Sequence, residues 1–169
     1  MPKPTFDLVY YVWSETLIGQ IGKESFRIHA VTGGGRGRTK GKEERSMDSF
    51  SPYRATDKSE DVRGGALPPG RWRIEKPSEY KGKMRKPVAK LTPKGNQLTD
   101  FAMRDYTDAP FLIHGRGEEG SDGCLVIEPD ERQRLLNAVE EAGGAILFVT
   151  LDTRPGDMIQ KTPTFHHTA

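Results

Sequence analysis

The apolar residues of this chain occur mainly in short runs of strand length, and glycine and proline separate most of them. Nineteen glycines and twelve prolines provide many turns, which favours a β-rich domain with long loops over a helical bundle. Runs rich in aromatic and β-branched residues are typical of buried strands, so we expect a mostly-β fold. The expected strands are residues 6–13, 16–21, 26–31, 71–75, 88–91, 111–114, 124–127 and 145–151, the last of them central.

One main helix is expected at residues 129–142. A proline early in this segment and acidic residues in its first turn suit the positive end of a helix, and two glycines stop it. Apolar side chains form a single stripe along it, as in a helix that covers a core. The residues concerned are Pro129, Asp130 and Glu131 at the start, Leu135, Leu136 and Val139 on the stripe, and Gly143 and Gly144 at the end.

The length of 169 residues allows one domain with a real core and is too short for two comfortable ones. We assign residues 1–154 to this domain and residues 155–169 to a polar C-terminal tail. The segment 33–65 has no periodic pattern, which is long for a loop in a compact domain. Such loops are either mobile or placed over a site, and the sequence does not choose between these roles.

The charge balance gives no reason to expect a nucleic acid or a membrane as partner, because 26 basic and 24 acidic residues leave a net charge of only +2. We interpret the basic stretches at 36–45 and 81–94 as solvated loops. No run approaches the roughly 20 apolar residues of a spanning helix. The N-terminus lacks a basic segment, a long apolar run and a small-residue cleavage site, so we expect synthesis in the cytoplasm without a signal peptide.

The most informative segment runs from His114, at the end of one apolar run, to Cys124, at the start of the next. Nine residues separate them, four of them glycine, and adjacent strands joined by such a loop can bring the two side chains together. An isolated thiol is mostly protonated at neutral pH, and a neighbouring imidazole that takes its proton activates it as a nucleophile. Gly123 gives the backbone access to conformations that other residues resist. The N–H groups of Gly123 and Cys124 can then stabilise an oxyanion.

This segment resembles the catalytic motif of L,D-transpeptidases, the YkuD-like domain, in which an H-G element precedes an S-x-G-C element. The resemblance implies a β-sandwich-like L,D-transpeptidase catalytic domain in which Cys124 attacks and His114 is the base. It also implies that the backbone carbonyl of Gly115 orients the imidazole, and that Ser121 and Gly123 shape the turn around the nucleophile. The likeness covers roughly residues 6–151, although only the His-to-Cys segment is specific.

Two positions depart from the family pattern. Asp122 stands where a second histidine is common, and Val126 stands where an arginine often follows the cysteine. We assign Arg116 as the substitute for that arginine and Asp122 as a second candidate substrate-binding residue. Asp122 could equally be a solvated loop residue or hydrogen-bond the turn. The short spacing looks more like the L,D-transpeptidase effectors of type VI secretion, and segment 67–72 is similar to their P-P-G-x-aromatic segment.

The resemblance implies an enzyme that acts on peptidoglycan tetrapeptide stems. Attack on the carbonyl of the third residue would release terminal D-alanine and leave a thioester. Water then gives L,D-carboxypeptidase activity, a D-amino acid gives exchange, and a second stem gives a cross-link. No metal or organic cofactor is required. An effector would be secreted without a signal peptide, act as an antibacterial toxin in the periplasm of a target bacterium, and have a secretion apparatus and an immunity protein as partners.

Other interpretations remain open. A lone cysteine is more often a small buried residue than a nucleophile. Zinc binding by Cys124, His114 and a tail histidine, His166 or His167, lacks the four ligands of a usual structural site. His29 lies in an apolar strand pattern, which favours a structural role. The alternative functions are another cysteine peptidase or amidase, and a catalytically inactive peptidoglycan-binding module.

Overall fold

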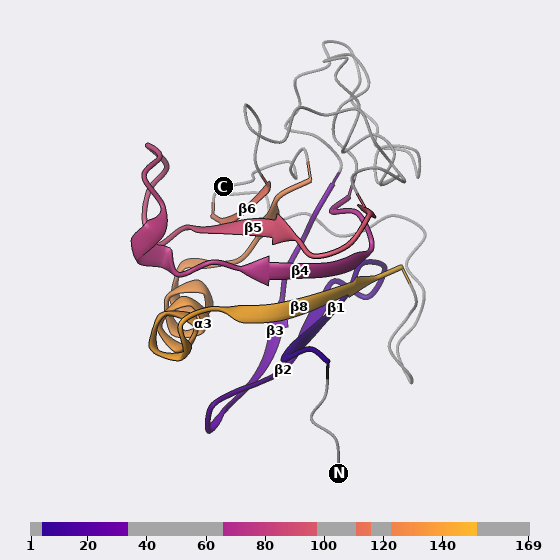
Figure 1. The fold of residues 1–169 in the computed structure, drawn as a ribbon, viewed down its shortest axis with the longest axis horizontal. Helices are drawn as coiled ribbons and strands as arrows, with labels where there is room; N and C mark the ends of the chain where they lie inside the picture. The colour runs from indigo at the N-terminus through magenta and orange to yellow at the C-terminus, as the bar shows by residue number, and fades with distance from the viewer. Residues whose placement is uncertain (1–4, 34–65, 98–110, 116–122, 152–169) are drawn as a thin grey trace.

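A computed structural model describes residues 5–33, 66–97, 111–115 and 123–151 of the chain. Within these ranges the fold is mostly β with one main α-helix, as the sequence predicts (Figure 1). The expected tail 155–169, and the expected loop 33–65 beyond its first residue, lie outside the described residues. The elements are β1 (Leu8–Tyr11), β2 (Thr16–Ile21), β3 (Glu24–His29), β4 (Gly70–Ile74), the 3-10 turn η2 (Pro77–Glu79), β5 (Ala89–Pro93), β6 (Phe111–His114), β7 (Leu125–Val126), α3 (Pro129–Ala142) and β8 (Ala145–Thr150).

The eight described strands form one sheet in the order β3-β2-β1-β8-β4-β5-β6-β7. β8 lies in the middle, parallel to β1 and antiparallel to β4, so the expectation of a central final strand is confirmed. Three expected strands, 6–13, 124–127 and 145–151, are shorter in the structure. The register of β1 with β8 stops at the pair Tyr11–Thr150, which ends both strands, and β7 has only two positions paired with β6.

The sheet curls until its two ends meet. Val31, which follows β3, and Val126 of β7 each donate a backbone N–H to the other's carbonyl oxygen, at 3.0 and 2.8 Å. β3 and β7 are the first and last strands of the sheet order, so this pair joins opposite edges. The curled sheet therefore brings the chain after β3 against the strand that begins just after Cys124.

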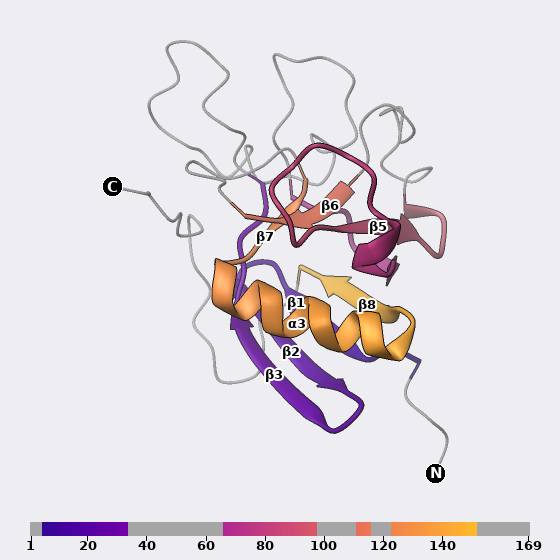
Figure 2. The same cartoon turned by 90° about the vertical axis from the view of Figure 1, so that its left-hand side faces the viewer.

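The helix α3 has the predicted bounds and lies against β2 and β3 (Figure 2). Pro129 occupies its first turn, and Gly143 ends it in the left-handed conformation with φ 78°. The expected apolar stripe is buried, together with Ala138 and, unexpectedly, Arg132. Among the described helices, none is both long and apolar enough to span a membrane.

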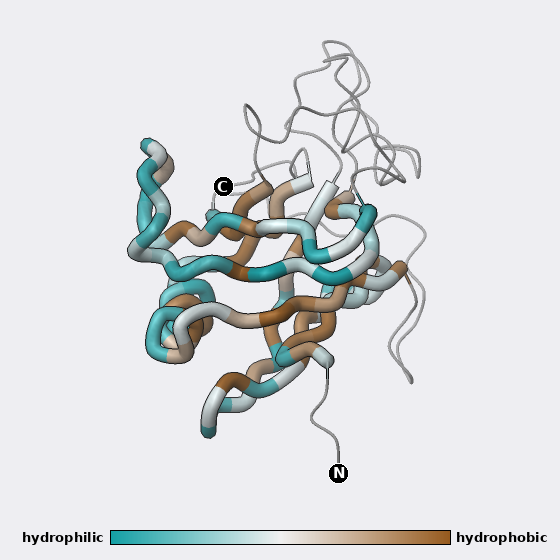
Figure 3. Tube along the Cα trace, in the orientation of Figure 1, coloured by the Kyte–Doolittle hydropathy of each residue, from teal (hydrophilic) through white to brown (hydrophobic). Residues whose placement is uncertain are grey.

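The core contains the inward faces of the strands, and hydrophobic segments gather where the strands cross the middle of the molecule (Figure 3). Trp72 and Ile74 of β4 are both fully buried, and two residues apart on a strand they share its inner face. The Trp72 ring meets Phe111 of β6 edge-on, with ring centroids 5.1 Å apart, and its indole N–H donates to the Pro68 carbonyl at 2.9 Å. This contact connects the proline-containing turn before β4 to the strand that carries His114.

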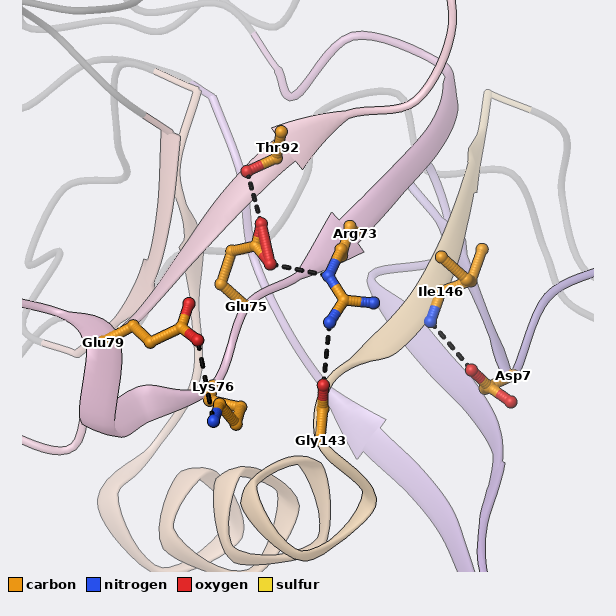
Figure 4. A network of polar contacts seen from close by, with 8 residues as sticks. All are labelled: Asp7, Arg73, Glu75, Lys76, Glu79, Thr92, Gly143 and Ile146. Atoms are coloured by element: carbon orange, nitrogen blue, oxygen red, sulfur yellow. Dashed lines mark hydrogen bonds and ion pairs between the residues drawn. The ribbon is translucent and has the colours of Figure 1, made fainter.

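A polar network lies on the outer face of the central strands (Figure 4). The Glu75 carboxylate accepts hydrogen bonds from Arg73 at 2.6 Å and from the Thr92 hydroxyl at 2.9 Å, so it joins β4 to β5. The Arg73 guanidinium also donates to the carbonyl oxygen of Gly143 at 2.8 Å. The network therefore fixes the C-terminal end of α3 to the sheet.

Candidate functional site

The strands that carry the predicted dyad are neighbours in the sheet. β6 and β7 pair in parallel, with Ile113 opposite Leu125 and His114 opposite Val126. The Ile127 N–H donates to the His114 carbonyl at 3.0 Å and extends the pairing by one residue. The expectation that the two apolar runs form adjacent strands is therefore confirmed, whereas Cys124 lies just outside the second strand.

Cys124 directly precedes β7, two positions before the pairing partner of His114. Because side chains alternate along a strand, extending β7 by one residue places Cys124 on the same face as Val126 and His114. Two residues span about 6.6 Å and adjacent strands lie about 4.8 Å apart, so the two Cα atoms are about 8 Å from one another. Side chains of histidine and cysteine are long enough to meet across that diagonal. Their meeting stays a prediction.

His114 is buried, with 4% of its surface exposed, and its ring is held by the chain next to it. Its Nδ1 atom lies 2.7 Å from the carbonyl oxygen of Gly115. A carbonyl oxygen can only accept, so Nδ1 carries the proton and the lone pair of the neutral ring is on Nε2. The resemblance to L,D-transpeptidases predicts this contact, because it assigns the carbonyl that orients the imidazole to the residue after the histidine. It sets the tautomer that a general base requires.

The backbone before the cysteine has the conformation that glycine favours. Gly123 is buried and has φ 107°, a value that residues with a Cβ rarely adopt. Cys124 is partly exposed, and as the single cysteine of the chain it forms no intramolecular disulfide. A partly exposed thiol beside a specialised turn is accessible to a substrate, whereas a fully buried one is not.

Arg132 is a site residue that the sequence interpretation missed. It lies in the first turn of α3, is 5% exposed, and donates to the carbonyl oxygens of Pro87 at 3.0 Å and Ile127 at 2.8 Å. A Cβ atom at Gly115 would overlap its guanidinium. The guanidinium therefore packs directly on the residue that holds the imidazole of His114.

A pocket of about 170 Å³ opens beside the imidazole. Its walls are Met84, Arg85, His114, Gly115 and Arg132. The pKa of Arg132 is lowered below its ordinary value, first by burial and then by the positive charge of Arg85. Arginine keeps its proton at neutral pH in spite of such a shift, so the wall of the pocket is cationic.

Two signals in the sequence could have identified Arg132. Arg132 continues the helical stripe of Leu135, Leu136 and Val139 three and four residues towards the N-terminus, so the period of the helix places its charge on the buried side. A cation in the first turn is also opposed by the helix dipole. Arg85 belongs to the basic stretch 81–94, which we interpret from the sequence as a solvated loop, and it is exposed but lines the pocket. For residues 89–93 that interpretation is wrong, because they form β5, with Ala89 and Leu91 buried.

The remaining predicted site residues, Arg116, Ser121 and Asp122, lie outside the described residues, as do His166 and His167. His29 ends β3, and its ring lies 3.5 Å from the Glu15 carboxylate, away from the pocket walls. No group of three potential metal ligands occurs among the residues that the structure describes. Comparison of the chain with protein-family models, with curated proteins and with solved structures gives no match.

Proposed function

We propose that the protein is a cysteine acyl-transfer enzyme in which Cys124 is the nucleophile and His114 is its general base. The observation that carries this proposal is the 2.7 Å contact between Nδ1 of His114 and the Gly115 carbonyl, at the end of the strand that pairs with β7, which Cys124 directly precedes. An enzyme of this kind needs an accessible thiol and, next to it, an imidazole whose tautomer leaves a nitrogen free to take the thiol proton.

The particular activity that we propose is that of an L,D-transpeptidase-like enzyme on peptidoglycan tetrapeptide stems, with L,D-carboxypeptidase action. The motif resemblance supports this substrate, and the curled, mostly-β sheet is compatible with a sandwich-like domain of that kind. The same resemblance supports a role as a secreted antibacterial effector.

In the proposed reaction, Nε2 of His114 takes the thiol proton, and the sulfur attacks the carbonyl carbon of the third stem residue. The oxyanion that forms accepts hydrogen bonds from the backbone N–H groups at Gly123 and Cys124. The amide bond then breaks, and the imidazolium gives its proton to the departing amine of D-alanine. A thioester remains on Cys124. Water, deprotonated by His114, hydrolyses the thioester, and the proton returns to the sulfur.

The test is incubation of purified tetrapeptide muropeptides with the protein, followed by mass spectrometry. Loss or exchange of a single terminal D-alanine is the expected result. Cleavage elsewhere would indicate another peptidase or amidase. Unchanged muropeptides that still bind the protein would indicate a binding module.

Two variants test the assigned roles. Cys124→Ala and His114→Ala should each abolish turnover while circular dichroism shows an intact fold. His29→Ala is the matched control, because this histidine is exposed and lies away from the pocket, and its turnover should equal that of the native protein. Full activity in either dyad variant would contradict the mechanism.

The effector role has its own test. Expression directed to the periplasm of a bacterial host should be toxic and expression in the cytoplasm should not, since the proposed substrate is outside the cytoplasm. Equal survival in both cases would contradict a role as a wall-damaging toxin.

A further inference from the structure

Arg132 is a buried cation with no acidic partner among the described residues. Its Nε and Nη1 atoms donate to two backbone carbonyls, those of Pro87 and Ile127, while Nη2 makes no hydrogen bond within the described part of the chain. Arg73, Lys76, Arg134 and His29 each form an ion pair with a carboxylate, whereas Arg132 forms none with the described residues. Burying a charge without a counter-ion is costly, and proteins rarely do so without a purpose.

Arg85 makes this region more cationic. Its charge acts on Arg132 and contributes to the lowered pKa of that side chain. Arg85 also has no carboxylate partner in the described ranges, and both arginines line the pocket beside His114. Two like charges brought together, one of them buried, are stabilised most effectively by an anion between them.

We propose that this pocket binds the C-terminal α-carboxylate of the residue that the enzyme releases. The inference rests on the proposed function, and it identifies how the substrate is recognised at that site. In a tetrapeptide stem the scissile amide nitrogen and the terminal carboxylate carbon are attached to the same Cα, so they are only about 2.5 Å apart. A group that holds this carboxylate therefore lies next to the scissile bond, as Arg132 lies next to the imidazole.

Such a site explains removal of a single residue. A stem with one more residue at its C-terminus has no charge at this position, and an amide there cannot satisfy a guanidinium as a carboxylate does. The same pocket accepts the carboxylate of a free D-amino acid, which is the acceptor in the exchange reaction. Arg132, on α3, thereby takes the role that the sequence interpretation gave to Arg116.

The experiment compares the tetrapeptide L-alanyl-γ-D-glutamyl-meso-diaminopimelyl-D-alanine with its C-terminal amide. Turnover of both is measured with the native protein, and binding of both is measured by calorimetry with Cys124→Ala, which cannot turn them over. The acid should bind, and react in terms of kcat/KM, about tenfold to a hundredfold better than the amide, the usual advantage of a hydrogen-bonded charge pair. The effect should lie mainly in KM.

Three variants test which side chain causes the preference for the acid over the amide. Arg132→Gln should reduce the acid-to-amide ratio to about one, and Arg85→Gln, at an exposed position, should reduce it by about threefold. Arg134→Gln is the matched control on the same helix, since Arg134 pairs with Glu24 and Glu131 and is absent from the pocket, and it should keep the native ratio. If Arg132 had only a structural role, Arg132→Gln would lower the activity on both peptides equally, and that result would overturn the inference. If Arg132→Gln does not fold, the acid-to-amide ratios of the native protein and of Arg85→Gln still test the inference.

The outcomes separate this inference from the proposed function. Release of the terminal residue from acid and amide at equal rates overturns the carboxylate site and leaves the function standing. Preferential binding of the acid by Cys124→Ala without any turnover by the native protein supports the anion site and overturns the function. Absence of binding to either peptide overturns the inference.

Discussion

The Nδ1 atom of His114 lies 2.7 Å from the carbonyl oxygen of Gly115, the residue that follows it in the chain. Gly115 has no side chain, and the guanidinium of Arg132 fills the space where one would be. Imidazole, turn and guanidinium therefore form one packed unit.

The first prediction concerns the reactivity of the Cys124 thiol. If Nε2 of His114 takes its proton, the thiolate fraction at neutral pH exceeds the few per cent of an isolated cysteine. Alkylation by iodoacetamide at pH 7 should then be about tenfold slower in His114→Gln than in the native protein. Mass spectrometry of the single cysteine measures the rate without a substrate. His29→Gln should alkylate at the native rate, and equal rates in all three proteins would show that the two side chains do not interact.

The second prediction concerns the space at Gly115. Alanine at this position places a methyl group on the Arg132 guanidinium, so Gly115→Ala should cost about 1–3 kcal/mol in the free energy of unfolding and lower turnover through the displaced imidazole. Urea denaturation and the muropeptide assay measure the two effects. Gly22→Ala is the control: its Cβ meets no atom, it has φ 61°, and it should cost about 1 kcal/mol with turnover unchanged. Native stability in Gly115→Ala would contradict the close packing.

The third prediction concerns the aromatic contact beneath β6. Trp72 is fully buried against Phe111, on the strand that ends in His114. Trp72→Ala should cost about 3–5 kcal/mol in the free energy of unfolding, because it removes a large buried side chain and the hydrogen bond to the Pro68 carbonyl. Trp72→Phe keeps part of the packing and should cost less. Thermal denaturation measures both, and a loss below about 1 kcal/mol in Trp72→Ala would contradict a central role for this contact.

The fourth prediction compares the two glycines after α3. Gly143 has φ 78°, and a Cβ atom at this position would lie in open space, so Gly143→Ala should cost about 1 kcal/mol from backbone strain alone. Gly144 has φ 120°, and its Cβ would press on the Arg73 guanidinium that donates to the Gly143 carbonyl. Gly144→Ala should therefore cost more, about 2–3 kcal/mol. Equal losses on chemical denaturation would show that the Arg73 side chain moves aside freely.

Elements with clear local signals were predictable from the sequence. α3, β2 and β6 have their expected bounds, because capping residues, alternation and turns mark them without help from distant segments. The central position of β8 was also predictable from its nearly continuous apolar run, although only alternate residues of the strand are fully buried. Strand ends were less predictable, because they depend on where a partner strand stops.

The direction of strand pairing and the closure of the sheet were not predictable. Nothing local shows that β6 and β7 run parallel, or that Val31 pairs with Val126 to close the curl, because both depend on contacts far apart in sequence. The motif identified His114 and Cys124, but it could not identify Arg132. That side chain enters the site only because α3 packs over the segment before β5 and the connection after β7.

The last prediction concerns Tyr10 and stability at high pH. Its hydroxyl is fully buried and donates to the Ala30 carbonyl at 2.7 Å, and burial, with the charge of Glu15 adding to it, raises the pKa of Tyr10 well above 10.0. Above about pH 10 the unfolded chain therefore loses a proton that the folded protein keeps, and the free energy of unfolding falls by up to about 1.4 kcal/mol per pH unit from this residue. Below pH 10 the contribution is fully present. Tyr10→Phe should cost about 1 kcal/mol in the free energy of unfolding at pH 7, because the hydrogen bond is lost. Above pH 10 its free energy of unfolding should fall less steeply, by up to about 1.4 kcal/mol per pH unit, because the proton of Tyr10 is no longer involved. Urea denaturation across pH 7–11 measures both effects, and identical slopes in the two proteins would mean that the Tyr10 hydroxyl ionises as readily in the folded protein as in the unfolded chain.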